Sequence, residues 1–493
     1  MSSISISRRS ALLAIGVGAI AVGWSAAQGA PPEHTPPAAV TIGEHPIVEH
    51  HLSQADIDAG LVGFNALREH GRLLFDARFN RLDGQGRPGS TGTGAPRGLG
   101  QPAFIRTSAP DANSCAGCHN QPTSGGAGDI VANVFVLAQA LDPVTDSVNP
   151  AFSNERNTLG MFGAGPIEML AREMSAELIA IREDSTRAAR ALGNPVTRSL
   201  SAKGVAFGRI TVLPDGRVDP TQIEGVDWDL IVKPFHQKGA VVSLREFSNN
   251  AMNHHHGMQS TERFGADIDA DLDGVVNELT TGDITAVTVF QASLPVPQAR
   301  LPAQPVRRNA ALLGEQVFNA VGCSSCHVPE LPLASRFFTE PNPFNPPGNL
   351  RAMPGTPVFR WDMTVQGSEP RLRRAGNGAI VRAFTDLKRH DLCDADYSFY
   401  CNERLAQGNL GGFASPATFT VPVAPRPTRQ FLTRKLWDVG NTDPYGHRGD
   451  LTTLSDAIYY HGGEARGARD AFFALPVPQQ GAVIEFLRSM QVL

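Results

Sequence analysis

Two short segments of the sequence carry the residue types that attach a redox cofactor covalently. Each has two cysteines three positions apart with a histidine directly after the second: Cys115, Cys118 and His119 in the first half, and Cys323, Cys326 and His327 in the second. Thiols at this spacing can form thioether bonds to both vinyl groups of one haem, and the histidine then lies below the iron as its proximal ligand. The sequence therefore predicts two covalently bound haem c groups.

The same cysteine spacing also occurs in zinc sites and in redox-active dithiols. Zinc would need four ligands at each site, so a histidine at once after both cysteine pairs fits haem better. The other two cysteines, Cys393 and Cys401, are predicted to close a short disulfide loop in an oxidising compartment, with two free buried thiols as the alternative.

The sixth position on each iron decides between electron transfer and chemistry. In the second half, residues 443–451 resemble the Pro-Tyr-x-His-x-Gly motif of bacterial di-haem peroxidases, in which a methionine near this point ligates the C-terminal haem. Gly446 stands in that slot here, so we expect His447 to ligate the second iron. The alternative is that His447 bonds a haem propionate or a backbone carbonyl. Weaker candidates for the ligand are His461, Met363 and Met490.

Three consecutive histidines in the first half are the candidate acid–base groups: His254, His255 and His256. A peroxidase pocket needs a base and a charged or polar group that polarises the O–O bond. Glu246 or Glu262 is the nearby carboxylate expected to complete the pair, and a metal-binding or purely structural cluster is the alternative. Three tryptophans could relay electrons between haems or simply fill cores: Trp437, Trp228 and Trp361.

A third constellation follows the calcium-loop template. Its predicted ligands are Asp269, Asp271, Asp273 and Asn277, with Gly274 at the sixth position of the loop. The twelfth position is Thr280, so the usual bidentate glutamate is missing, and Glu278 or Asp283 could replace it. The pattern indicates calcium, with a solvated acidic turn as the alternative.

The bulk composition sets limits on the partners. The chain has 493 residues, a formal net charge of −5, and 41% hydrophobic residues. The length indicates about two or three domains, and the charge does not favour a nucleic-acid or anionic-membrane partner.

The N-terminal residues 1–30 have the pattern of a signal peptide. Arg8 and Arg9 precede an apolar run over residues 11–24 and a small-residue stretch over residues 25–30. A membrane anchor is the alternative, but the run is shorter than the roughly 20 residues that span a bilayer. We expect a periplasmic protein without a membrane span after cleavage. The arginine pair resembles a twin-arginine signal, whereas haem c is attached to chains exported unfolded, so both export routes stay open.

Several elements must position these residues. Helices are predicted over residues 53–79 and 309–321, and over the C-terminal residues 479–493, where Val483, Phe486, Leu487 and Met490 share a face. Residues 209–218 predict a hairpin, and residues 230–232 and 241–242 predict further short strands. The segment between residues 330 and 376 has no periodic pattern.

The expected fold is therefore mainly α, with two cytochrome c-like haem domains, long loops and a small β insertion near residues 204–244. A proline-rich stretch at residues 295–305 marks the boundary, so the domains are residues 31–300 and 301–493.

Longer strings resemble a known family. Five segments carry the resemblance: residues 113–122, 159–168, 233–239, 250–259 and 432–454. They are similar to the bacterial di-haem oxidoreductase family, whose members are described as peroxidase-like or thiol-oxidoreductase-like, and the similarity runs from about residue 70 to residue 493. It implies a two-haem peroxidase-like enzyme. Di-haem cytochrome c peroxidases, the di-haem enzymes that oxidise protein tryptophans, and haem rubber oxygenases are more distant relatives.

Two classes of function follow from these observations. In an enzyme, the first haem binds peroxide or dioxygen and the second passes electrons from a small redox protein or another donor. In an electron carrier, both irons are six-coordinate. A carrier needs about 100 residues per haem, so the length favours the enzyme; a haem oxygenase acting on an organic substrate is a further alternative.

Overall fold

A computed structural model of the chain describes residues 43–86, 112–128, 132–134, 154–271, 273–395 and 429–492. The predicted signal peptide and Cys401 lie outside the described residues, as does the side chain of His254. Residues His45–Leu493 form one unit, which holds every element named below, and the division into two haem domains near residue 300 stays a prediction.

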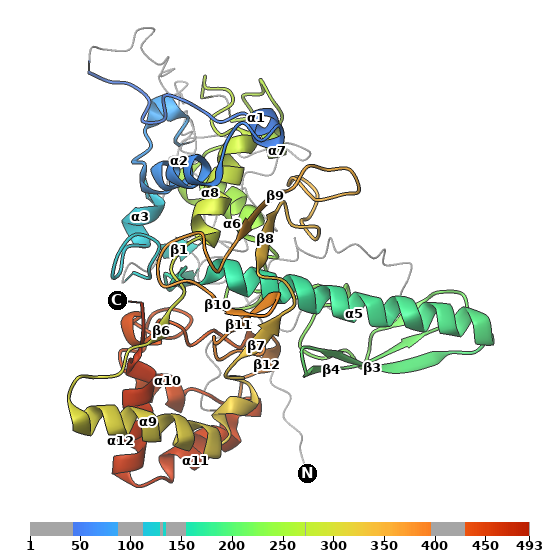
Figure 1. Cartoon of the computed structure of the whole chain (residues 1–493), viewed down its shortest axis with the longest axis vertical. Coiled ribbons are helices and arrows are strands. Elements are labelled where there is room, and N and C mark those ends of the chain that lie inside the picture. The colour runs from blue at the N-terminus through green and yellow to red at the C-terminus, as the bar shows by residue number, and fades with distance from the viewer. Residues whose placement is uncertain are drawn as a thin grey trace, which may run out of the picture. The chain divides into compact units, whose positions relative to one another are not determined.

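The first half is built around a close helix crossing (Figure 1). Helix α2 (Phe64–Asp76) packs against α8 (Thr281–Ala292). A Cβ atom on Gly71 would lie only 2.0 Å from the carbonyl oxygen of Ala286. Because glycine lacks that atom, the two backbones can come into direct contact. One turn further on, Phe75 and Phe290 meet with ring centroids 5.3 Å apart.

The second half repeats this crossing with different helices. Helix α9 (Pro305–Ala320) packs against α12 (Val477–Arg488). A Cβ atom on Gly314 would lie 2.0 Å from the carbonyl oxygen of Ala482, and Phe318 and Phe486 meet at 5.5 Å.

The two helix pairs match residue by residue. In each pair, a phenylalanine lies four positions after the glycine on one helix. A second phenylalanine lies four positions after the contacted alanine on the other helix. The predicted helix at residues 309–321 is confirmed. The C-terminal helix is confirmed as far as Arg488, with Val483, Phe486 and Leu487 buried, whereas Met490 lies beyond its end in the short strand Met490–Gln491. The predicted helix over residues 53–79 is broken instead into α1 (Gln54–Asp58) and α2, because Gly60 adopts a left-handed φ of 73° between them.

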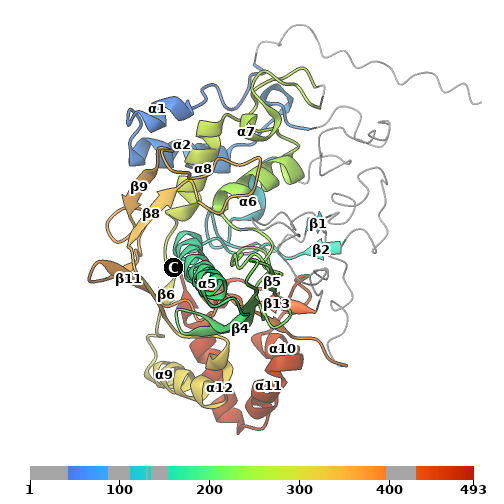
Figure 2. The same ribbon diagram turned by 90° about the vertical axis from the view of Figure 1, so that its right-hand side faces the viewer.

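The long helix α5 (Ala164–Leu192) lies between the two crossings, as Figure 2 shows. Against it packs a three-stranded sheet of β3 (Val196–Ala202), β4 (Val205–Val212) and β5 (Val218–Asp219). The predicted hairpin is confirmed by the antiparallel pairing of β4 with β5.

The strand predicted at residues 230–232 is not formed, because Leu230 takes a left-handed φ of 64° and the Ile231 amide turns back to Asp229. Residues 241–242 contribute only an isolated bridge, between Phe235 and Val241.

The second half also contains strands, which corrects the expectation of a mainly α fold. The segment that lacked periodicity forms β7 (Leu331–Leu333), β8 (Phe337–Glu340), β9 (Phe359–Asp362) and β10 (Arg373–Ala375). Further strands are β11 (Gly378–Val381), β12 (Arg389–Asp391) and β13 (Gln430–Leu432). These strands are three or four residues long, too short to give a clear alternation of polar and apolar residues. The described fold is therefore mixed.

Short elements complete the described chain. The helices are α3 (Cys115–Cys118), α6 (Leu244–Ala251), α7 (Thr261–Phe264), α10 (Leu454–Tyr459) and α11 (Arg466–Phe473), with a π-helical turn at Met252–His256. The 3₁₀ turns are Arg81–Asp83, Cys323–Ser325, Val439–Asn441 and Gly463–Ala465. The strands are β1 (Ala132–Val134), β2 (Asn154–Arg156), β6 (Gln298–Ala299) and β14 (Met490–Gln491).

The two halves are joined by buried contacts. Trp361 of β9 packs on Phe64 of α2 at 5.7 Å. Arg245 of α6 is fully buried and pairs with Glu340 of β8 at 2.8 Å and with Glu262 at 2.6 Å. Since a buried charge is tolerated only when it is paired, this triad fixes β8 against the first-half core.

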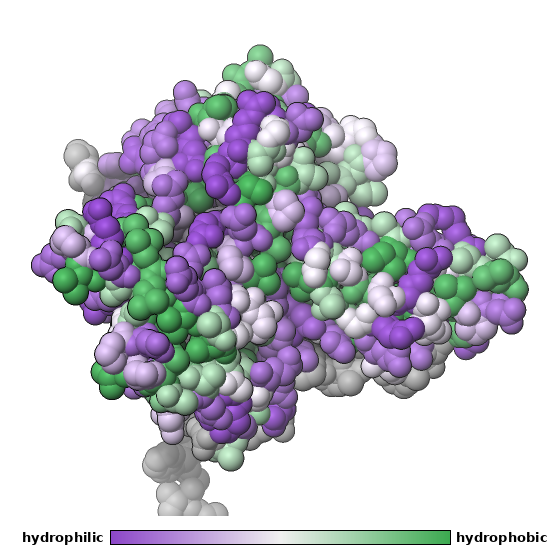
Figure 3. Space-filling view, turned by 60° about the horizontal axis from the view of Figure 1, so that its bottom comes forward, coloured by the Kyte–Doolittle hydropathy of each residue, from purple (hydrophilic) through white to green (hydrophobic). Residues whose placement is uncertain are grey.

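The surface around the second helix pair mixes apolar and polar residues (Figure 3). Val306 at the start of α9 is 82% exposed and Val477 at the start of α12 is 79% exposed. Among the described residues, no helix is both long enough and apolar enough to cross a membrane.

The glycine at each crossing gives a testable prediction. Replacing Gly71 or Gly314 by alanine forces a methyl group against a backbone carbonyl, so each change should lower the free energy of unfolding by about 2 kcal/mol or more. Gly481 of α12 is the matched control, because a Cβ there meets nothing within 4 Å. Gly481→Ala should be neutral or stabilising by up to about 1 kcal/mol. Denaturant unfolding measures all three, and equal stability of Gly314→Ala and Gly481→Ala would contradict the close crossing.

Candidate functional site

The first cysteine motif lies beside the first helix crossing. Cys115 and Cys118 begin and end α3 and carry free thiols. His119 follows directly, and its Nδ1 lies 3.3 Å from the carbonyl oxygen of Gly126. Burial lowers the pKa of His119 to about 4. The imidazole is therefore neutral at pH 7, and with Nδ1–H donating to a carbonyl its Nε2 lone pair is left to bind a metal.

The second motif has the same arrangement. Cys323 and Cys326 are free thiols at the 3₁₀ turn after α9. The Nδ1 of His327 lies 3.0 Å from the carbonyl oxygen of Phe384. Burial lowers the pKa of this histidine also to about 4, so its Nε2 is likewise available as a neutral ligand.

Each histidine lies against the phenylalanine of its helix crossing. The ring centroids of His119 and Phe75 are 6.3 Å apart with an angle of 52°, and those of His327 and Phe318 are 6.2 Å apart with an angle of 56°. Two thiols, a neutral imidazole and an apolar ring thus recur in one geometry at both sites. This donor set suits a haem held by two thioether bonds and one axial nitrogen.

Two cationic side chains near the second motif also suit a bound haem. Arg434 and Lys435 are half-buried, and burial lowers the pKa of Lys435 to about 7 and that of Arg434 to about 10. Within the described part of the chain, neither side chain makes a hydrogen bond or an ion pair. Their segment lies beside the backbone that holds His327. The Leu436 amide donates to the carbonyl oxygen of Ala383, and the next residue, Phe384, accepts from His327. Desolvated cations are stabilised by anions, and a haem carries two propionates.

His256 is the candidate acid–base histidine that the structure places beside the first motif. Its Nε2 lies 3.5 Å from the Cys115 sulfur and its Nδ1 lies 2.6 Å from the carbonyl oxygen of Ala112. Burial lowers its pKa to about 4. His255 is half-buried, and its charge acts on both His119 and His256.

The candidate carboxylates form their hydrogen bonds elsewhere. Glu246 Oε2 accepts from the amide of Val242 at 2.7 Å, within the turn that begins α6. Glu262 is held in the ion pair with Arg245. These hydrogen bonds and ion pairs direct both carboxylates to partners other than His256.

His447 lies at the contact between the two halves. It is buried, its Nδ1 is hydrogen-bonded to the side-chain oxygen of Gln237, and its ring meets Phe431 edge-on at 5.5 Å. Its carbonyl oxygen accepts from the amide of Asn157 at 3.2 Å. The first-half residues 157 and 237 thus both bond this histidine.

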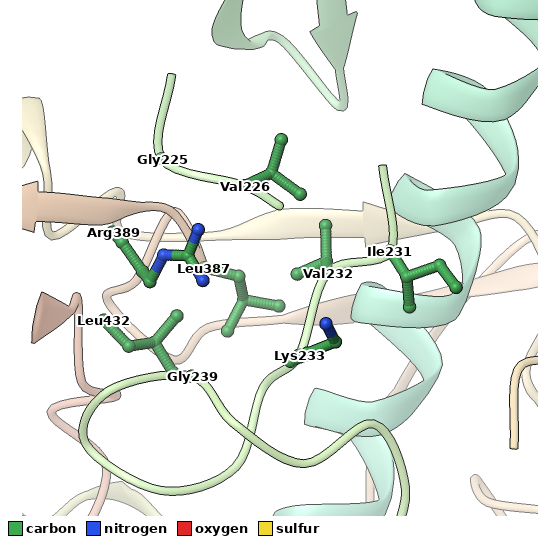
Figure 4. A pocket seen from close by; sticks show the side chains of 9 residues that line it. All are labelled: Gly225, Val226, Ile231, Val232, Lys233, Gly239, Leu387, Arg389 and Leu432. Carbon is green, nitrogen blue, oxygen red and sulfur yellow. The ribbon is translucent and has the colours of Figure 1, made fainter. Parts of the chain in front are cut away.

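A small cavity of about 10 Å³ lies close to this contact (Figure 4). Its lining residues are Gly225, Val226, Ile231, Val232, Lys233 and Gly239 of the first half and Leu387, Arg389 and Leu432 of the second. Lys233 and Arg389 both pair with Asp227 beside it. The cavity has room for about one water molecule, so it belongs to the packing of the two halves.

The aspartates of the calcium-loop pattern do come together. One carboxylate oxygen from each of Asp269, Asp271 and Asp273 lies within 4.8 Å of the others. Burial, reinforced by the charge of Asp271, raises the pKa of the neighbouring Glu278 to about 10, so Glu278 lies beside the cluster. Asn277 instead bonds Asp267 at 2.9 Å.

Asp283, the other suggested substitute in the calcium loop, is used elsewhere. It accepts from His51 and His70 at 2.6 and 2.7 Å.

Sequence reasoning gave His461 only as a weaker candidate and did not single out His390, Arg434 or Lys435. His461 lies beside His327, with ring centroids 6.3 Å apart. His390 donates to Asp386 and to Glu464, both at 2.8 Å; burial lowers its pKa, but the bond to Asp386 and further partners raise it to about 11. Isolated polar residues in irregular segments, or in a strand as short as β12, carry no periodic signal that could have identified them.

The remaining candidates are placed as follows. Cys393 is disulfide-bonded, as expected. Trp361 and Trp228 belong to the buried core. Trp437 packs on Gly163, close to Met161, whose amide donates to Gly125 in the loop that follows the first motif. Trp437 therefore lies where the first motif's surroundings meet the second half, and its role as a relay stays a prediction.

Comparison with known proteins adds a family. Residues 426–490 match the model of the family described as "Di-haem oxidoreductase, putative peroxidase". Over these residues the resemblance predicted from the sequence is confirmed, and the match supports an oxidoreductase. No curated protein matches the chain.

Two solved structures show weak similarity. Hydrazine synthase of Kuenenia stuttgartiensis, studied under 20 bar of xenon, is 16% identical over 62% of this chain and 87% of that chain, with a TM-score of 0.27. A MauG-like protein associated with microbial copper homeostasis is 15% identical over 66% of this chain and 88% of that chain, with a TM-score of 0.24. Scores this low carry no argument about the fold or the function.

The acidic cluster gives a prediction about calcium. If it binds the ion, calcium at about 100 times Kd should raise the free energy of unfolding by about 3 kcal/mol, and Asp271→Ala should abolish the effect. Asp267→Ala is the control, because Asp267 is exposed in the same loop but bonds Asn277. Calorimetric titration and thermal unfolding with and without a chelator measure both. If the protein binds no calcium and its unfolding temperature does not change with the chelator, the cluster is only an acidic turn.

Proposed function

We propose that this chain, which carries a di-haem oxidoreductase family segment, is a periplasmic peroxidase-like oxidoreductase with two covalently attached haem c groups. One observation carries the proposal: both cysteine motifs have the same surroundings, a glycine-mediated helix crossing, a phenylalanine and a histidine whose Nδ1 faces a backbone carbonyl. A repeated arrangement of this kind is expected of two sites that hold the same group.

The residues that would hold each haem follow from this arrangement. Cys115 and Cys118 would form the thioether bonds of the first haem and His119 its proximal bond. Cys323, Cys326 and His327 would do the same for the second. Arg434 and Lys435 would neutralise propionates of the second haem. When bound, haem supplies an iron that can exchange electrons and, where one axial position is open, bind peroxide or dioxygen.

The protein's own groups prepare the iron ligands. The carbonyl groups of Gly126 and Phe384 hold His119 and His327 in one tautomer and increase the electron density on Nε2. Phe75 and Phe318 exclude water from the side of each imidazole, and the close helix pairs keep both rings in place.

The neighbours of the second histidine support a division of labour. Both imidazoles have a phenylalanine neighbour, and the ring of His461 also lies beside His327, with ring centroids 6.3 Å apart. The first haem is therefore proposed as the reactive one and the second as the electron-transfer one. Reduction of hydrogen peroxide to two water molecules consumes two electrons and two protons, and a small redox protein would supply the electrons.

His255 is the proposed acid–base group of the first site. It is half-buried and adjoins His256, which lies beside the first motif. His256 already has both ring nitrogens near partners, so it is proposed to position Cys115 instead.

The cysteine motifs provide the first test of this function. Cys115→Ala or Cys326→Ala removes one thioether bond, so the pyridine haemochrome assay should fall from two covalent haems per chain to one or fewer. Gly117→Ala is the control, because a Cβ there meets nothing within 4 Å, and it should retain two. A count that stays at two in either cysteine variant would refute the assignment.

The reaction with peroxide provides the second test. Peroxide should change the absorption of the ferric two-haem protein and should sustain oxidation of a reduced donor protein. The Cys323→Ala/Cys326→Ala variant, which keeps only the first haem, should still respond to peroxide but lose donor oxidation, because electron delivery is cut. A two-haem protein that does not react with peroxide would favour the electron carrier.

A further inference from the structure

We propose that His461, and not His447, is the second axial ligand of the haem bound at His327. This inference rests on the proposed function, because it requires a haem at residues 323–327. It assigns the second haem a pair of imidazole ligands that come from the α9–α12 half alone.

The distance between the two rings suits one metal ion placed between them. Two imidazoles on opposite faces of a metal, with metal–nitrogen bonds of about 2 Å, have ring centroids about 6 Å apart. The centroids of His327 and His461 are 6.3 Å apart. Their interplanar angle of 49° is compatible with ligation, because each ring can rotate about its own bond to the metal.

The tautomers of both rings also fit. The Nδ1 of His461 lies 2.7 Å from the carbonyl oxygen of Ala457, and the Nδ1 of His327 lies 3.0 Å from that of Phe384. Each Nδ1 therefore donates its proton to a carbonyl group, and each Nε2 keeps its lone pair.

The backbone fixes the position of His461. It follows α10, and its amide donates to Ile458 at 3.1 Å. The Gly463 amide donates to Asp394 at 2.9 Å, and a Cβ on Gly462 would lie only 2.2 Å from the Asp394 carboxylate. Asp394 thus holds the two glycines after His461 tightly. A ligand on such a fixed turn loses little conformational freedom when it binds a metal.

The next residue along the turn is fixed as well. Glu464 accepts from His390 at 2.8 Å, and His390 also donates to Asp386 at 2.8 Å. Asp386 is two residues from Phe384, whose carbonyl group supports His327. A short polar chain therefore joins the backbone that carries His461 to the backbone that orients His327.

His447 has a different set of neighbours. Its partners include Gln237, Phe431 and Asn157, and residues 157 and 237 belong to the first half. We therefore assign His447 to the docking of the two halves.

The test compares two histidine variants of the full two-haem chain. His461→Ala should keep two covalent haems but convert the low-spin electron paramagnetic resonance signal of the second haem to high-spin, and added imidazole should restore it. His447→Ala, the matched control, should keep the low-spin signal. A low-spin signal that survives in His461→Ala, or that is lost in His447→Ala and restored there by imidazole, would overturn the assignment.

A third variant keeps the test decisive if His461→Ala folds poorly. His461→Met should remain low-spin, and the reduction potential of the second haem should rise, because a thioether favours the ferrous state more than an imidazole does. An unchanged potential would contradict ligation by residue 461. Failure of the proposed function is distinguishable, because it would appear as a missing second haem in the haemochrome assay of the unmodified protein.

Discussion

The direct contact between two helix backbones in each half is the constraint on which the rest of the structure depends. Gly71 meets the carbonyl group of Ala286, and Gly314 meets that of Ala482, each at a distance that leaves no room for a side chain. Such contact fixes both the separation and the rotation of the helices. Phe75 and Phe318 each lie one turn after the crossing glycine, so the two rings occupy equivalent positions in the two helix pairs. Each cysteine motif then presents its histidine to that phenylalanine.

The electrostatics of both sites follow from this packing. A histidine beside an apolar crossing loses hydration, which lowers its pKa and keeps it neutral. The surrounding backbone then determines which ring nitrogen stays free. Desolvation also affects Lys435 and Arg434, and here it is unfavourable unless an anion is bound. The same burial thus prepares neutral nitrogen ligands and leaves two cations in need of negative charge, and a haem with its propionates would satisfy both.

The local motifs could be predicted from the sequence, whereas the long-range contacts could not. The cysteine motifs, the hairpin at β4 and β5, and the amphipathic C-terminal helix depend on neighbours a few positions away. The pairing of His461 with His327 depends on how α10 is placed against the cysteine motif that follows α9, which no spacing encodes.

His447 was preferred because its segment resembles a peroxidase motif, although its side chain faces Gln237 of the first half. The short strands between residues 331 and 381 formed where periodicity was absent; β7 is stabilised by pairing with β11 and β8 by pairing with β9, segments some distance away along the chain. Asn277 fits the calcium-loop spacing, yet its left-handed backbone turns it toward Asp267.

Mass spectrometry of proteolytic peptides from the purified, unmodified protein is the most direct test of the claim that the two helix crossings are equivalent haem sites. The account predicts that the peptide containing residues 115–119 and the peptide containing residues 323–327 each carry the mass of one haem, bound through both cysteines, and that no other peptide does. Recovery of either peptide with two free thiols, or with a disulfide between them, from protein matured in a haem c-attaching host would contradict it.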